Sequence, residues 1–130
     1  MIVLDASAMV EALVGRDPDA ELLQALSGDI DAPHLLDVEV LSALRGLVLG
    51  GKLEAEVAEA ARLDHFAFSI NRHDAAPLAD RIWALRHHFT SYDACYLALA
   101  EALAAPLYTC DAKLAASGHE AEVRVLPGTP

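Results

Sequence analysis

The chain has 130 residues, of which 55% are hydrophobic, 20 are acidic and nine are Lys or Arg, so that its formal net charge is −11 and its pI is about 4.7. This length fits one domain, residues 1–130, with a sizeable core. The acidic balance argues against nucleic-acid binding driven by Lys and Arg alone. It still permits a phosphate substrate if carboxylates hold a divalent metal that meets the phosphates.

Other bulk features predict a cytoplasmic protein without a membrane span. The longest uncharged run, 102–110, is far shorter than the roughly 20 residues of a spanning helix. No basic region precedes the first apolar residues, and Asp5 interrupts them, so we expect no signal peptide. Cys95 and Cys110 lack the spacing of a metal site or a disulfide framework and are expected to be free thiols. A mean hydropathy of +0.31 suggests that some apolar surface is buried against a partner.

The first predicted element is a strand over residues 2–4, and a helix over 6–14 follows it. Three apolar residues without alternation are typical of a parallel strand that is covered on both faces. Asp5 stands where the strand ends and the helix begins. It can therefore cap the helix, or it can lie in a site, because open α/β sheets bind ligands at this edge.

The rest of the chain alternates between helical and strand patterns, which predicts an α/β fold with a mostly parallel sheet of about four to five strands and helices on both faces. The next expected elements are a helix over 19–26 capped by Asp17, a brief strand over 31–34, and helices over 36–49 and 54–65 that pack as a hairpin. A strand over 66–70, a helix over 75–88 and a helix from Thr90 to about Ala104 are expected to follow. The last expected elements are a strand over 107–110, a short helix over 111–117 and an edge strand over 122–126.

Four acidic residues fall at one predicted edge of this sheet. Asp5 and Asp111 follow strands, whereas Glu39 and Asp93 lie in the first turns of helices. Acids also favour helix N-termini because of the helix dipole, and Thr90-x-x-Asp93 resembles a capping box. The pattern alone therefore leaves both a shared metal site and a set of helix caps open.

Four segments resemble, in order, the four motifs of PIN-domain ribonucleases. They are residues 3–8 with Asp5, residues 32–40 with Glu39, residues 92–101 with Asp93, and residues 107–114 with Asp111. Their order and spacing are similar, over the whole chain, to those of the VapC toxins of bacterial toxin–antitoxin pairs. The resemblance implies a three-layer PIN-like fold, a shared metal site, and endonucleolytic hydrolysis of structured RNA, of the tRNA or rRNA class, by the toxin of a type II system.

The chemistry of the four acids agrees with that resemblance. Carboxylate oxygens suit hard Mg²⁺ or Mn²⁺, and such a metal lowers the pKa of a bound water and neutralises charge on a phosphodiester under attack. We expect all four acids to be metal ligands, directly or through water, and one of them to accept the proton of the attacking water. Thr109 points to the same face of its strand as Asp111. Together with Ser7 it is expected to support the ligands.

Other classes of protein fit the sequence less well. A receiver domain needs two adjacent acids after the first strand, a haloacid dehalogenase-type phosphatase needs Asp-x-Asp, and a dinucleotide-binding module needs a Gly-rich turn. Ala6 and Ser7 follow Asp5 instead, and no glycine precedes Gly15. A catalytically silent PIN-like interaction module is the alternative that remains outside the enzymes.

The resemblance also implies partners. We expect a homodimer that binds the C-terminal segment of a VapB-like antitoxin. Part of the predicted hairpin surface over 36–49 would supply apolar contacts, and an antitoxin Arg or Lys would reach the acids.

Overall fold

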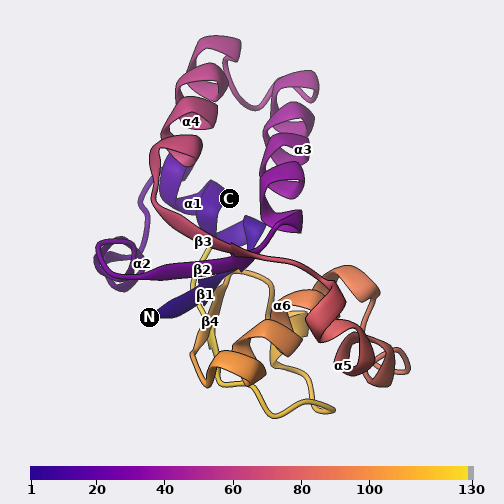
Figure 1. The fold of residues 1–130 in the computed structure, drawn as a ribbon. Coiled ribbons are helices and arrows are strands. Elements are labelled where there is room, and N and C mark those ends of the chain that lie inside the picture. The colour runs from indigo at the N-terminus through magenta and orange to yellow at the C-terminus, as the bar shows by residue number, and fades with distance from the viewer. Residues whose placement is uncertain (129–130) are drawn as a thin grey trace.

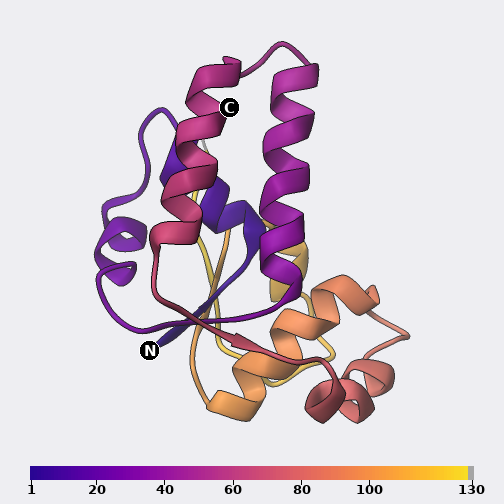
Figure 2. The same ribbon diagram turned by 45° about the horizontal axis from the view of Figure 1, so that its top comes forward.

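A computed structural model, which describes residues 1–128, has a five-stranded sheet between two groups of helices (Figures 1 and 2). The strand order is β3-β2-β1-β4-β5, and every neighbouring pair is parallel. This confirms the expected fold class. The strands are β1 (Ile2–Leu4), β2 (Ile30–Pro33), β3 (Ile70–His73), β4 (Leu107–Thr109) and β5 (Val123–Val125).

Helices α1, α3 and α4 lie on one side of the sheet, and α5 and α6 lie on the other (Figure 1). The helices are α1 (Ala6–Val14), α2 (Ala20–Ala25), α3 (Leu35–Leu49), α4 (Ala55–Ala67), α5 (Ala79–Ala84) and α6 (Ser91–Leu103), with 3₁₀ turns η1 (Ala76–Leu78) and η2 (Ala112–Ala115). No helix among the described residues is both long and apolar enough to cross a membrane.

The core is built around β1 and α6. All three residues of β1 are buried, as expected for a central strand with helices on both faces. In α6, every residue from Ala94 to Ala100 is buried, so this helix is apolar all round rather than amphipathic. This burial fixes the first turn of α6, which carries Asp93, against the centre of the sheet.

The helix after Pro18 begins later than expected. Asp19, not Asp17, is the N-cap of α2, and its Oδ1 accepts a hydrogen bond from the backbone N–H of Glu21 at 2.8 Å. The prediction placed Pro18 in the first turn of the helix, but Pro18 and Asp19 both precede it. The cap must be the residue next to the first turn, so Asp19 takes that role.

Two elements near the middle of the chain also differ from the prediction. The strand expected over 66–70 is β3 over Ile70–His73, because α4 continues through Ala67 and the four residues of β3 pair in register with those of β2. The helix expected over 75–88 is shorter: it consists of η1 and α5, and a turn follows Ala84. Pro77 lies in η1, the first turn of this segment, where its missing N–H is tolerated.

The tip of the α3–α4 hairpin is a tightly bonded turn. Gly51 has a φ of 72°, a left-handed conformation that favours glycine. The N–H of Gly51 donates to the carbonyl of Val48 at 3.0 Å, and the N–H of Lys52 donates to that of Leu47 at 2.9 Å. This pattern is a Schellman motif. It confirms that the glycine pair ends α3, and it fixes the backbone of Lys52.

Candidate active site

The acidic edge, which we define as Asp5, Glu39, Asp93 and Asp111, forms around the adjacent carboxyl ends of β1 and β4. Asp5 follows β1 directly, and its backbone N–H donates to the carbonyl of Tyr108 in β4 at 3.2 Å. Its Oδ1 also accepts from the N–H of Ala8 at 3.0 Å, so Asp5 is the N-cap of α1. The capping role considered from the sequence is therefore real, but it uses only one of the two carboxylate oxygens.

Two hydroxyl groups hold the carboxylate of Asp5 in place. Ser7 Oγ donates to Asp5 Oδ1 at 2.7 Å, and Thr109 Oγ1 donates to Asp5 Oδ2. These hydroxyls accept in turn from backbone N–H groups: Ser7 from Cys110 and Thr109 from Asp111, each at 2.9 Å. Asp5 is 6% exposed and Thr109 is fully buried. The network joins the ends of β1 and β4 and leaves the Asp5 side chain little freedom to rotate.

Over the described part of the chain, the protein supplies only one cation, Lys113, to the carboxylates at this edge. Burial raises the pKa of Asp5 above its ordinary value despite its three hydrogen bonds, and the charge of Asp111 adds to the rise. Burial likewise raises the pKa of Asp93; the Lys113 ammonium opposes this shift and Asp111 reinforces it. Lys113 Nζ lies 3.7 Å from Asp111 Oδ2 but is largely exposed. Asp5, Asp93 and Asp111 are therefore electrostatic neighbours that repel one another.

Glu39 joins this group through a buried tyrosine. Tyr96 Oη donates to Glu39 Oε1 at 2.6 Å, and Tyr96 is only 2% exposed. Burial raises the pKa of Tyr96, and its hydrogen bond to Glu39 and the charges of Glu39 and Asp5 raise it further, so the phenol lies within electrostatic range of both carboxylates. Tyr96 was not among the residues expected at this site from the sequence. Its spacing of three residues from Asp93 puts both side chains on one face of α6 and was the available signal.

The four acids fit a hard divalent cation by their chemistry. All are carboxylates, the ligands that Mg²⁺ and Mn²⁺ prefer, and a bound cation would relieve the repulsion that raises the pKa of Asp5 and Asp93. Within residues 1–128, however, no three His, Cys, Asp or Glu side chains are close enough together to hold a metal ion as they stand. Binding would therefore require the side chains to move closer together.

Two other acids near the starts of helices, Asp37 and Asp74, contact basic side chains. Asp37, in the first turn of α3, accepts from Arg72 Nε at 2.7 Å through Oδ2, and its Oδ1 lies 2.8 Å from Nε2 of the fully buried His65. Burial alone would raise the pKa of Asp37, but Arg72 and His65 outweigh it and lower the pKa. Asp74 pairs with His34 at 3.2 Å on the surface. These contacts agree with leaving both acids out of the predicted site.

Comparison with known proteins gives a consistent result. The family model described as "PIN domain" matches residues 2–119. The chain is 45% identical over 129 residues to "Ribonuclease VapC1" of Mycobacterium tuberculosis, covering 95% of this chain and 96% of that protein.

Solved structures agree in fold. The crystal structure of M. tuberculosis VapC20, titled a sarcin–ricin loop cleaving toxin, has a TM-score of 0.65 at 17% identity and covers 92% of this chain and 97% of its own. A toxin–antitoxin complex from Klebsiella pneumoniae has a TM-score of 0.57 at 21% identity, with coverage of 90% and 92%.

Proposed function

Because this chain belongs to the PIN-domain family and, within it, to the VapC ribonucleases, we propose that it is a metal-dependent endoribonuclease that cleaves structured RNA, of the tRNA or rRNA class. Asp5, Glu39, Asp93 and Asp111 are its catalytic carboxylates, and its site of action is the cytoplasm. In this role the protein is the toxin of a type II toxin–antitoxin pair.

One observation carries this proposal: the carboxylate of Asp5 is buried, held by two hydroxyls and not paired with any cation of the described residues. Keeping such a group oriented and ionised without a partner is costly. A protein gains little stability from that arrangement, so the arrangement points to a ligand with positive charge. Four carboxylates around one edge select a hard divalent cation, and both Mg²⁺ and Mn²⁺ meet that requirement.

The residues of the chain then have separate tasks. Asp5, Asp93, Asp111 and Glu39 would hold Mg²⁺ or Mn²⁺, which supplies an acidified water and neutralises charge on the phosphodiester. Thr109 and Ser7 orient Asp5, and Tyr96 orients Glu39, through the hydrogen bonds described above. Asp93, which is half-buried and has a raised pKa, is suited to accept the proton of the attacking water.

The decisive experiment is cleavage of total RNA by the purified protein with Mg²⁺, with Mn²⁺ and with a chelator. We expect cleavage with either metal, none with the chelator, and none by Asp93→Asn, which is nearly isosteric and lacks the charge. Mapping the cut sites identifies the RNA. A folded wild-type protein that leaves RNA intact with both metals would support the silent interaction module instead. Labelling by acetyl phosphate would indicate the receiver-like alternative.

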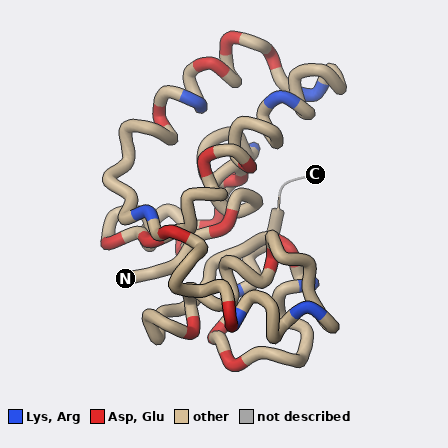
Figure 3. Tube along the Cα trace, turned by 45° about the vertical axis from the view of Figure 1, so that its right-hand side comes forward, with Lys and Arg blue, Asp and Glu red and all other residues tan. Residues whose placement is uncertain are grey.

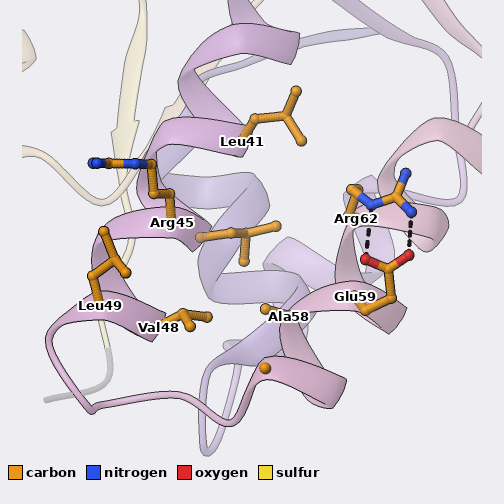
Figure 4. A pocket seen from close by; sticks show the side chains of 9 residues that line it. Leu41, Arg45, Val48, Leu49, Ala58, Glu59 and Arg62 are labelled. Atoms are coloured by element: carbon orange, nitrogen blue, oxygen red, sulfur yellow. Dashed lines mark hydrogen bonds and ion pairs between the residues drawn. The ribbon is translucent and has the colours of Figure 1, made fainter.

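The α3–α4 hairpin offers a groove for an antitoxin segment. A hollow of about 270 Å³ lies between the two helices, and apolar side chains line it (Figure 4). Leu49 at its edge is 68% exposed and Leu41 is 38% exposed. The charged groups beside it are Arg45 and the Glu59–Arg62 pair. An amphipathic segment with apolar anchors and an acid facing Arg45 would fit this groove. A basic residue further along the segment could then reach the acidic edge.

A second apolar surface suits a homodimer. Trp83 is 68% exposed and Tyr92 is 62% exposed. Both border a hollow of about 450 Å³ between η1, α5 and the start of α6. A protruding side chain such as Trp83 beside a hollow suits a twofold interface, because the side chain of each copy can fill the hollow of the other. We therefore assign this patch to a second copy of the chain.

Two substitutions separate these assemblies. Trp83→Ser should give a monomer by light scattering at micromolar concentration and still bind the product of the neighbouring gene. Leu49→Ser should remain a dimer and bind that product more weakly. A wild-type protein that is monomeric with and without the partner would refute the dimer.

A further inference from the structure

A larger cleft, of about 710 Å³, opens beside the acidic edge between α1 and the tip of the α3–α4 hairpin. Ser7 and Cys110 line the end of the cleft next to the acids, and Ser7 is the residue that donates to Asp5. The volume is within the roughly 300–1,000 Å³ of typical ligand sites. The apolar part of the lining is Val10 and Val14 from α1 with Leu47 and Leu53 from the hairpin.

Cations are scarce in this protein and most are already paired. Acidic residues outnumber Lys and Arg along the whole trace (Figure 3). Five of the nine cations form ion pairs with carboxylates: Arg62, Arg72, Arg81, Lys113 and Arg124. Within residues 1–128, the four without such a pair are Arg16, Arg45, Lys52 and Arg86. Arg16 and Lys52 are exposed, and both line this cleft.

The opposite charges lie deeper in the cleft. Glu11, on α1, is 8% exposed. Glu11 lines the cleft, and Ser7 at the end of the cleft donates to the carboxylate of Asp5. The interior is therefore negative or apolar, whereas the two free cations stand at its rim. A small anion would be repelled from the interior. A nucleotide fits better, because its phosphate can stay at the rim while its uncharged base and ribose pack against the apolar wall.

The dimensions of the cleft place Arg16 beyond the reacting phosphate. Ser7 and Val14 are seven positions apart on α1, which is about 10 Å along the helix axis at 1.5 Å per residue, and Arg16 follows two residues beyond the end of the helix. Lys52 faces the same cleft from the hairpin, where the Gly51 turn fixes its backbone. Both cations can therefore meet the RNA backbone one or more nucleotides away from the phosphate that is attacked at Asp5.

We propose that this cleft binds the RNA strand beside the scissile phosphate, with Arg16 and Lys52 contacting backbone phosphates. The proposal rests on the proposed function and adds a substrate-binding surface to it. It also explains how a chain with a net charge of −11 can hold RNA: its few free cations lie where the strand must run.

The test measures RNA binding directly. Fluorescence anisotropy of a labelled single-stranded oligouridylate is recorded over a series of salt concentrations with Asp93→Asn protein, which does not cleave it. Adding Arg16→Ala or Lys52→Ala should weaken binding about fivefold each and lower the slope of log K against log salt by about 0.7 per lost phosphate contact. Arg86→Ala, which removes an exposed arginine outside the cleft that forms no ion pair with a carboxylate of the described residues, is the matched control and should change neither. Arg16→Lys should restore the slope.

Cleavage kinetics give an independent readout. In an otherwise wild-type protein, Arg16→Ala and Lys52→Ala should raise KM for RNA and leave kcat unchanged. If wild-type protein cleaves RNA but both variants behave like Arg86→Ala, the cleft proposal is overturned and the proposed function stands. If the variants bind RNA normally but lose the antitoxin, the cleft belongs to a protein partner. If wild-type protein neither cleaves nor binds RNA, both proposals fail.

Discussion

Asp5 and Asp37 are aspartates at the starts of helices on the same sheet, yet their surroundings are opposite. Asp5 is buried among hydroxyl groups and other carboxylates, and its pKa is raised. Asp37 contacts Arg72 and His65, and its pKa is lowered. The Asp37 network, which we define as Asp37, His65 and Arg72, joins α3, α4 and β3. It therefore stabilises the fold, whereas the surroundings of Asp5 leave a charge that the protein does not satisfy.

This difference in contacts separates a structural acid from a proposed metal ligand better than position does. Both residues lie where the helix dipole favours an acid. What distinguishes them is whether a cation of the protein is already present. A carboxylate that is oriented but lacks a cation is suited to receive one from solution.

The largest expected effect tests that distinction directly. Asp5→Asn and Asp37→Asn make the same change at the two positions. Asp5→Asn should lower kcat by on the order of 10³ or more, since a metal supplies several kcal/mol of transition-state stabilisation. It should fold normally, because asparagine also caps helices. Asp37→Asn should keep kcat within a few-fold of wild type. Comparable losses of kcat in the two variants, measured at equal metal, would remove the distinction.

The loss of stability should follow the reverse order and be larger in Asp37→Asn than in Asp5→Asn. Asp37→Asn leaves Arg72 and the buried His65 without their anion. It should cost about 3 kcal/mol of unfolding free energy, the low end for a broken buried pair, because Asp37 is 21% exposed. A lowered folded-state pKa contributes stability above the unfolded pKa near 3.8, which is lost as pH falls through the folded value. The gap between wild type and variant in urea titrations should therefore close below pH 4. If the difference in unfolding free energy persists below pH 4, the loss of stability in Asp37→Asn comes from packing and not from charge.

Metal binding should sharpen the contrast through pH. A raised folded-state pKa for Asp5 and Asp93 means that these groups oppose folding increasingly as pH rises through the unfolded pKa, until the folded pKa is passed. Mg²⁺ or Mn²⁺ at a hundredfold excess over its dissociation constant should add about 2.7 kcal/mol. The rise in Tm should be larger at pH 7.5 than at pH 5. It should shrink in Asp5→Asn and remain in Asp37→Asn. Equal stabilisation at both pH values would mean that these acids are only helix caps.

The smallest effect concerns the hydroxyl that holds Asp5. Thr109→Val keeps the shape of the side chain but removes the donor to Asp5 and the acceptor for the N–H of Asp111. Loss of such a supporting contact typically costs 10- to 100-fold in metal affinity or activity. Titration of activity with Mn²⁺ should show a higher metal requirement for Thr109→Val and a nearly normal one for Thr109→Ser. Identical titrations of both variants would show that Thr109 does not position the ligand.

The order of elements and the edge that carries Asp5 and Asp111 could be predicted from sequence, because apolar runs and glycine punctuation are local signals. The strand expected over 66–70 was wrong because Phe66, Phe68 and Ile70 alternate like a strand while Phe66 still belongs to the last turn of α4. The cap of α2 was wrong because acids stand on both sides of Pro18. In each case two local patterns overlapped, and pairing with β2 or helix geometry decided between them.

The side chains that contact the acids could not be predicted from the sequence for a different reason. Tyr96 contacts Glu39 across 57 residues, and Arg72 contacts Asp37 across 35. Such contacts depend on how helices and strands pack, which residue spacing does not encode. The metal-ligand roles of the four acids, including Glu39 and Asp93, stay predictions until the variants are measured.

The hydrogen bond between Thr109 and Asp5 joins residues that are 104 positions apart. During synthesis on the ribosome Asp5 emerges early, and its carboxylate can be fixed by Thr109 only after β4 has been synthesised. At 5–20 residues per second this delay is several seconds. A chain that stalls within the α3–α4 hairpin already contains Asp5 and Glu39 but has neither Thr109 nor Asp93. On the proposed assignment, a chain interrupted at this point would lack two of its four catalytic carboxylates, Asp93 and Asp111.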